Sequence, residues 1–121
     1  MLRQVRRAFS SFPIRKTFVM SVYPNQIEEY KKRHNPIWFE LEHTLKEHGV
    51  LNYSIHHLED TNQLFAFAEI ECEEKWNSIA ETDICKKWWK YMGDIMPSND
   101  DSSPITKDLK EVFHICKDSA K

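Results

Sequence analysis

Two spacings of apolar residues alternate along this chain and predict an α+β fold. Runs rich in β-branched and aromatic residues indicate strands at 15–23, 50–58, 64–71 and 109–116. Apolar residues recurring every three or four positions indicate helices from about 25 to 47, at 73–80 and at 83–96. The resulting order, β-α-β-β-α-β, matches the ferredoxin-like arrangement, in which helices cover one face of an antiparallel sheet.

The third predicted strand is apolar on both faces. Phe65 and Phe67 alternate with Leu64, Ala66 and Ala68, and side chains in a strand alternate between the two faces of the sheet. One chain of this length has too few helices to cover both faces. We therefore expect a homodimer that packs sheet against sheet.

The first helical stretch is interrupted in its middle. Asn25 with Glu28 resembles a capping box at its start. Pro36 breaks the helix, because it lacks an N–H and clashes with the preceding turn. Asn35 and Pro36 suit the cap and first position of a second helical segment, so His34 is expected at a break.

Tyr30 and His34 are four residues apart and share one apolar helical stripe. The stripe comprises Ile27, Tyr30, His34, Ile37, Trp38, Leu41 and Leu45. An imidazole that titrates near neutral pH beside a phenol is a candidate acid/base pair. The alternative is a core histidine whose ring nitrogens are simply hydrogen-bonded.

Three other aromatic residues are candidate ligand contacts. Trp88 and Trp89 are adjacent and point about 100° apart on a helix, so one can pack in the core while the other reaches a pocket. Tyr53 places a hydroxyl on one face of the second strand. All three could instead be packing residues. His56 and His57 point to opposite faces of a strand, and no metal-ligand spacing occurs, so we expect no metal.

Composition excludes several classes of function. The 121 residues suit one domain, and 40% are hydrophobic. A net charge of −2 offers no footprint for nucleic acid, and no apolar run approaches the ~20 residues of a membrane span. Two glycines exclude glycine-rich phosphate loops. Cys72, Cys85 and Cys116 are widely spaced and odd in number, which suits reduced thiols and a cytoplasmic location.

The first twelve residues differ from the rest of the chain. They carry Arg3, Arg6 and Arg7 with no acidic residue, followed by a single predicted domain over 13–121. Such a segment has features of a transit peptide, but its shortness favours a basic tail or helical extension over organelle import.

Five segments of the chain resemble the L-rhamnose mutarotase family. They read IRKTFVM at 14–20, EYKKRHNPIW at 29–38, NYSI at 52–55, TDICKKWWKYM at 82–92 and DIMP at 94–97. The likeness runs from about residue 14 to Phe113. It implies a dimeric α+β protein that interconverts the anomers of L-rhamnose without cofactor or metal. It also implies His34 as the acid/base residue and Tyr30, Tyr53, Trp88 and Trp89 as contacts to the sugar.

Two other classes remain open on the residues alone. One is a different enzyme on the same dimeric fold, such as a cofactor-free oxygenase or a haem-degrading protein with His34 as an axial ligand. The other is a sugar-binding module without catalysis. The two can be told apart by haemin binding and by the rate of anomer exchange.

Overall fold

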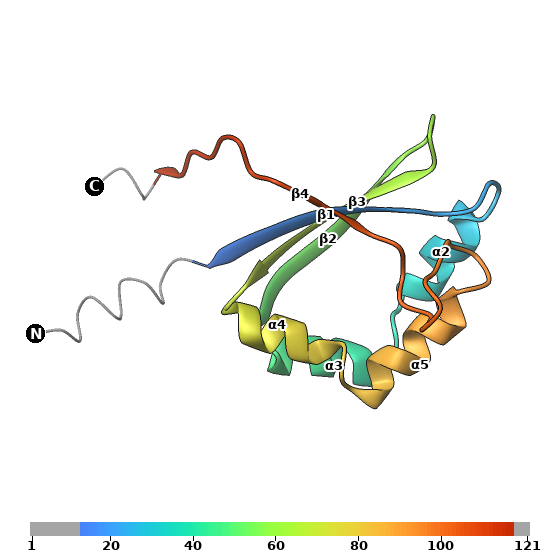
Figure 1. The fold of residues 1–121 in the computed structure, drawn as a ribbon, viewed down its shortest axis with the longest axis horizontal. Helices are drawn as coiled ribbons and strands as arrows, with labels where there is room; N and C mark the ends of the chain where they lie inside the picture. Colours follow the sequence, from blue (N-terminus) through green and yellow to red (C-terminus); the bar gives the residue numbers. More distant parts are fainter. Residues whose placement is uncertain (1–12, 118–121) are drawn as a thin grey trace, which may run out of the picture.

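The computed structural model describes residues 13–117, in which a four-stranded antiparallel sheet is covered on one face by helices (Figure 1). The elements in chain order are β1 Ile14–Ser21, α2 Ile27–His34, α3 Phe39–Glu47, β2 Val50–Leu58, β3 Gln63–Ile70, α4 Glu73–Ile79, α5 Asp83–Met92 and β4 Lys107–Leu109. The strands are arranged in the order β2-β3-β1-β4. The predicted ferredoxin-like α+β fold is confirmed.

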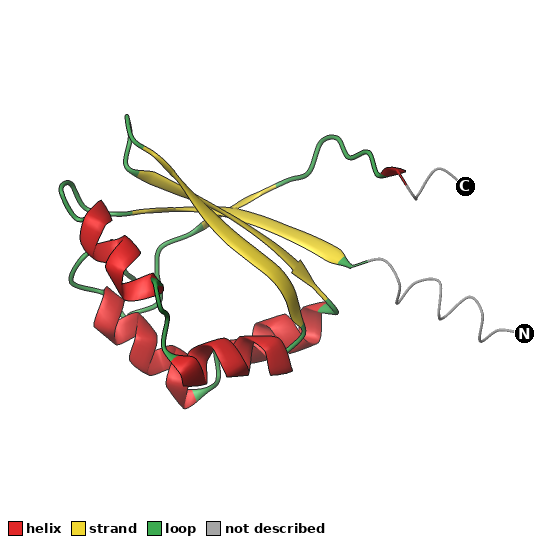
Figure 2. Cartoon of the chain, turned by 180° about the vertical axis from the view of Figure 1, so that it is seen from behind, coloured by secondary structure: helices red, strands yellow, loops and turns green. Residues whose placement is uncertain are grey.

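Alternation along β3 decides which face of the sheet is buried. Leu64, Ala66, Ala68 and Ile70 are at most 1% exposed, whereas the residues between them are only partly buried. The helices labelled in Figure 1 all lie on one side of the sheet, as the view from behind in Figure 2 also shows. The main core is formed by Met20, Val22, Tyr30, Leu41, Leu64, Ala66, Ile84, Trp88, Met92, Ile95 and Met96.

The predicted helix break occurs, but its details differ from the prediction. α2 ends at His34, a cis peptide bond joins Asn35 to Pro36, and α3 begins only at Phe39. Asn35 therefore does not cap α3. Its side-chain amide instead donates to the carbonyl of Lys31 at 2.8 Å and closes the end of α2.

The start of α2 also differs from the predicted capping box. Asn25 adopts a left-handed conformation with φ of 67° in the turn before the helix, and it makes no cap. Asparagine tolerates this region because its short side chain can hydrogen-bond locally. The capping-box interpretation was wrong: Asn25 supplies the left-handed residue of the turn, and its side chain does not cap the helix.

The last predicted helix and strand are both shorter than expected. α5 stops at Met92 with Gly93 as its C-cap, not at Met96. β4 pairs with β1 only from Thr17 to Val19. Residues after β4 leave the sheet, and Val112, Phe113 and Ile115 are 95%, 77% and 79% exposed. The strand prediction for 109–116 was largely wrong, because a run of alternating apolar residues forms a strand only where it can pair with the edge of a neighbouring strand.

Candidate active site

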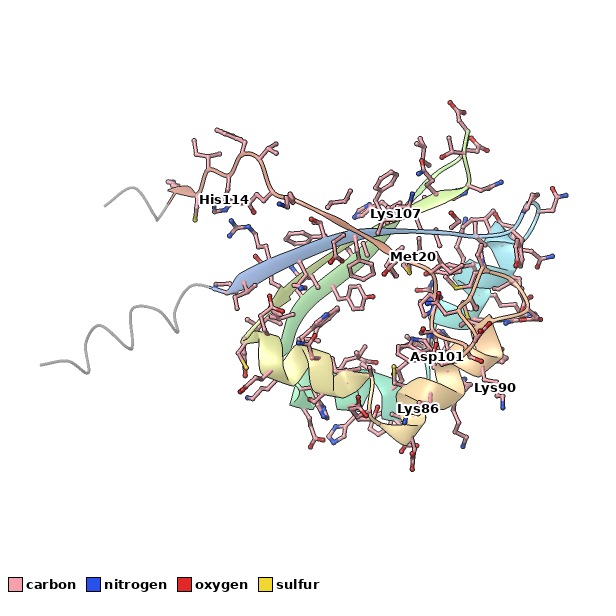
Figure 3. The ribbon with its side chains drawn as sticks, in the orientation of Figure 1. Met20, Lys86, Lys90, Asp101, Lys107 and His114 are labelled. Carbon is pink, nitrogen blue, oxygen red and sulfur yellow. The ribbon has the colours of Figure 1, made fainter. Side chains whose placement is uncertain are left out.

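A cavity of about 1400 Å³ lies on the helix-covered side of the sheet. Residues from β1, α2, β2, α4 and α5 line it, including Met20, which lies on the sheet side in Figure 3. All five candidate residues from the sequence line this one cavity: Tyr30, His34, Tyr53, Trp88 and Trp89. The fold therefore brings together side chains that are up to 59 positions apart in the chain.

His34 has a defined tautomer. Its Nδ1 lies 2.8 Å from the carbonyl oxygen of Tyr30, one helical turn earlier. Because a carbonyl oxygen only accepts hydrogen bonds, Nδ1 carries the proton and Nε2 carries the basic lone pair. Burial lowers the pKa of His34 below its usual 6.5, and the bond to the Tyr30 carbonyl opposes this only in part. The ring is thus neutral and basic at neutral pH.

Tyr30 and Tyr53 contribute two uncharged hydroxyl groups. Tyr30 is buried and its ring stacks on that of His34, with centroids 4.2 Å apart. Tyr53 stands on the inner face of β2, opposite Ala68. Burial raises the pKa of both phenols, and the nearby Tyr53 raises that of Tyr30 further. Both residues therefore remain neutral hydrogen-bonding groups at neutral pH.

Tryptophan side chains form an aromatic wall beside His34. Trp88 is 8% exposed and meets the His34 ring edge-on, with centroids 5.2 Å apart. Trp89 is only partly buried and packs against the core from the next position on α5. Trp88 is thus the more buried of the two, and both line the cavity.

Two further tryptophans were not identified as site residues from the sequence: Trp76 lines the cavity, and Trp38 packs behind Trp88 without lining it. Trp38 contacts Trp88 edge-on at 5.0 Å between centroids. Trp76 lines the cavity from α4 and meets Tyr53 at 5.9 Å and Phe18 at 6.2 Å. The available signal for Trp76 was a single large aromatic residue in an otherwise polar short helix.

The strand histidines both line the cavity and are paired with polar side chains of neighbouring residues. His56 Nε2 lies 3.1 Å from the Ser54 hydroxyl, and His57 Nε2 lies 3.1 Å from the Asn62 side-chain oxygen. Within residues 13–117, no group of three or more His, Cys, Asp or Glu side chains is arranged to hold a metal. No helix in this part of the chain is long and apolar enough to cross a membrane.

These groups together suit one type of chemistry. A neutral imidazole provides a base, two phenols provide hydrogen bonds, and indole rings provide apolar faces. Such a set can move a proton on an uncharged ligand that carries hydroxyl groups.

Comparisons with known proteins point to one family. A family model described as L-rhamnose mutarotase matches residues 15–115. A Shigella flexneri protein named L-rhamnose mutarotase is 58% identical over 102 residues, which are 84% of this chain and 98% of that protein.

Solved structures are similar to this chain at two levels of sequence identity. The L-rhamnose mutarotase of Formosa agariphila superposes with a TM-score of 0.77 at 42% identity, over 84% of this chain and 98% of that one. A putative antibiotic biosynthesis monooxygenase from Nitrosomonas europaea has a TM-score of 0.57 at 16% identity, over 78% and 84% of the two chains. The second likeness shows the fold alone.

Proposed function

The chain belongs to the L-rhamnose mutarotase family, and we propose that it interconverts the α and β anomers of L-rhamnose with His34 as the acid/base residue. The proposal depends above all on the 2.8 Å contact between His34 Nδ1 and the Tyr30 carbonyl. That contact leaves Nε2 as the basic nitrogen of a ring that lines the cavity. Mutarotation requires such a group, because a proton must leave one oxygen of the sugar and another must reach a second oxygen.

The proposed reaction conserves every atom of the sugar. His34 Nε2 accepts the proton of the anomeric hydroxyl while the C1–O5 bond breaks, and the protonated imidazole gives this proton to O5, which becomes a hydroxyl. The resulting aldehyde rotates about the C1–C2 bond. O5 then attacks the other face of C1, His34 takes the proton back from O5, and it returns the proton to the new anomeric oxygen. No electron leaves the sugar, so the reaction needs no redox partner.

Tyr30 and Tyr53 are proposed to hold the sugar oxygens during these steps. Tyr30 stacks on His34 and is the better placed of the two to hydrogen-bond to the ring oxygen or to assist the proton transfer. Because burial raises the pKa of both phenols, they act as neutral donors and acceptors. Trp88 and Trp89 are proposed to line the sugar through its C–H faces.

Anomer exchange measured by saturation-transfer NMR tests the proposed function. We expect the protein to speed the exchange of L-rhamnose above its spontaneous rate, and the same assay on L-fucose and L-lyxose measures how strictly it prefers L-rhamnose. The acceleration should survive treatment with a chelator. Binding of the sugar with exchange at the spontaneous rate would instead identify a non-catalytic binding module.

We also propose that the protein is a homodimer. The sheet face away from the helices carries the apolar residues Val19, Leu58, Phe65, Phe67 and Leu109, which share it by strand register. Leu58 is 43% and Leu109 42% exposed in the single chain. A second copy related by a two-fold axis would cover this face with the same surface of its own.

We also propose the limits of the domain and the cellular location of the protein. Residues 13–121 are proposed to form one domain, and the basic segment 1–12 lies outside the described residues. A cytoplasmic location is supported by three widely spaced cysteines, a number and spacing that suit a reducing compartment. Cell fractionation with an antibody to the protein tests this location.

A further inference from the structure

Arg33 makes a concentrated set of contacts directly beside His34. Its side chain is only 10% exposed. Its Nε donates to Glu29 at 2.8 Å, and Nη1 donates to the Tyr91 carbonyl at 2.7 Å. Nη1 and Nη2 donate to the two carboxylate oxygens of Asp94 at 2.9 and 3.3 Å. The guanidinium also lies 4.3 Å from the centre of the Tyr91 ring. We call Arg33, Glu29, Tyr91 and Asp94 the Arg33 clamp.

The Arg33 clamp joins two elements that both supply the site. Every side-chain hydrogen bond that α2 makes to α5 or Asp94, within the described part of the chain, comes from Arg33. His34 is the last residue of α2, and helix ends lose their regular hydrogen bonds and fray. An attachment at Arg33 therefore restrains the one turn of α2 whose position matters most for His34.

A series of ring contacts also connects the Arg33 clamp to His34. Tyr91 stacks on Trp38 with centroids 5.2 Å apart. Trp38 meets Trp88 at 5.0 Å, and Trp88 meets His34 at 5.2 Å. Arg33 and His34 are neighbours in the chain, so these contacts form a closed loop. A displacement of Arg33 moves the helix that carries His34 and the wall against which His34 packs.

From this geometry we propose that Arg33 is a positioning residue, which holds His34 at the cavity by fastening the last turn of α2 to the end of α5. The proposal rests on the proposed acid/base role of His34. Arg33 is absent from the residues that line the cavity, so it acts through its neighbour and does not touch the sugar. The planar fork of arginine suits this task, because it satisfies two carboxylates, a carbonyl and a ring at once.

The variant Arg33→Lys tests the proposal because lysine keeps the charge but loses the fork. We expect kcat for L-rhamnose exchange to fall by about 10- to 100-fold, since small misplacements of a catalytic group have effects of this size. KM should change much less than kcat. Asp94→Asn removes the opposite half of the clamp at an exposed side chain and should lower kcat in the same direction by a smaller factor.

The titration of His34 provides a readout local to the ring, and it is compared among variants whose circular-dichroism spectra match that of the wild-type protein. Its two ring neighbours in the described structure, Tyr30 and Trp88, carry no charge at neutral pH. NMR titration of the ring should therefore show a pKa closer to 6.5 in folded Arg33→Lys, because a loosened ring is more hydrated. A shift of the His34 pKa in Asp94→Asn but not in Arg33→Lys would assign the effect to charge alone and overturn the proposal.

Lys32→Gln serves as the matched control, because Lys32 is an exposed neighbour on α2 that does not line the cavity. It should keep wild-type kcat and the wild-type His34 titration. Equal losses in Lys32→Gln and Arg33→Lys, or an unchanged His34 titration in both clamp variants, would overturn the positioning role. If the wild-type protein fails to accelerate exchange, the proposed function fails, whereas the titration of His34 still decides whether Arg33 positions the ring.

Discussion

At the scale of single residues, the paired Tyr30 and His34 were predictable because their relation is local. A separation of four residues places two side chains on one helical face whatever the rest of the chain does. Their ring stacking at 4.2 Å follows from that spacing. The tautomer of His34 was not predictable, because it depends on which nitrogen meets the Tyr30 carbonyl.

Replacing His34 with asparagine should remove most of the catalytic acceleration. Asparagine is polar and of similar reach, so the fold and part of the sugar affinity should remain, but it cannot carry a proton between oxygens. General acid/base groups commonly contribute ~10²–10⁴-fold, and we expect a loss in that range by saturation-transfer NMR. Near wild-type exchange in His34→Asn would transfer the role to Tyr30.

The rate should depend on pH through the neutral form of His34. Burial lowers the pKa of this ring, so the folded protein keeps it neutral at pH values where a solvent-exposed histidine is already protonated. As the pH falls through the lowered pKa, the base is lost and kcat/KM declines. Exchange rates between about pH 5 and pH 8, corrected for spontaneous exchange, should therefore show an acid limb centred below 6.5. A limb centred above 6.5 would contradict the buried neutral ring.

At the scale of elements, the sequence indicated where helices and strands lie better than where they end. The break after α2 was predictable from Pro36, whereas the start of α3 at Phe39 was not. The place of Trp76 in the cavity lining and the contact of Trp38 with Trp88 were missed for a related reason. Their roles depend on how α3 and α4 face α5 and β2, which local spacing does not determine.

The two tryptophans of α5 should respond differently to truncation. Trp88 is 8% exposed within the core, and loss of a buried Trp commonly costs ~3–5 kcal/mol, so Trp88→Ala should lower the melting temperature more. Trp89 is partly buried at the cavity, so Trp89→Ala should raise the apparent KM for L-rhamnose more. Thermal melts and exchange kinetics of both variants measure this. Trp88→Phe replaces Trp88→Ala if the latter does not fold, and the reverse pattern would mean that the two roles are exchanged.

At the scale of the whole molecule, the order of elements was sufficient to predict the fold. Alternating apolar residues in β3 also indicated that both faces of the sheet need a cover, and helices supply only one of them (Figure 2). The final segment was assigned to a strand because its apolar residues alternate. Within the described chain most of that segment has no neighbouring strand, and Val112, Phe113 and Ile115 remain exposed.

Light scattering at micromolar concentration should give the mass of two chains. Phe67 lies on the uncovered sheet face, between Thr17 of β1 and Ser54 of β2. Phe67→Lys should therefore shift the protein toward the monomer, because a charged group would be buried between the two sheets. Phe39→Lys is the control, since Phe39 is 82% exposed on α3, on the helical side. A wild-type monomer, or an unchanged dimer in Phe67→Lys, would contradict the proposed interface.

The hydrogen bond from His34 to the carbonyl of Tyr30 has a consequence for how this site can be altered. The tautomer of the base is set within a single helical turn of α2, while much of the cavity lining comes from other elements, including β1, β2, α4 and α5. The lining on these other elements can therefore change without altering the contact that fixes the tautomer. A library that varies cavity positions on β2 and α4 leaves the histidine tautomer unchanged, and such a protein is a suitable starting point for the laboratory evolution of mutarotases with new sugar preferences.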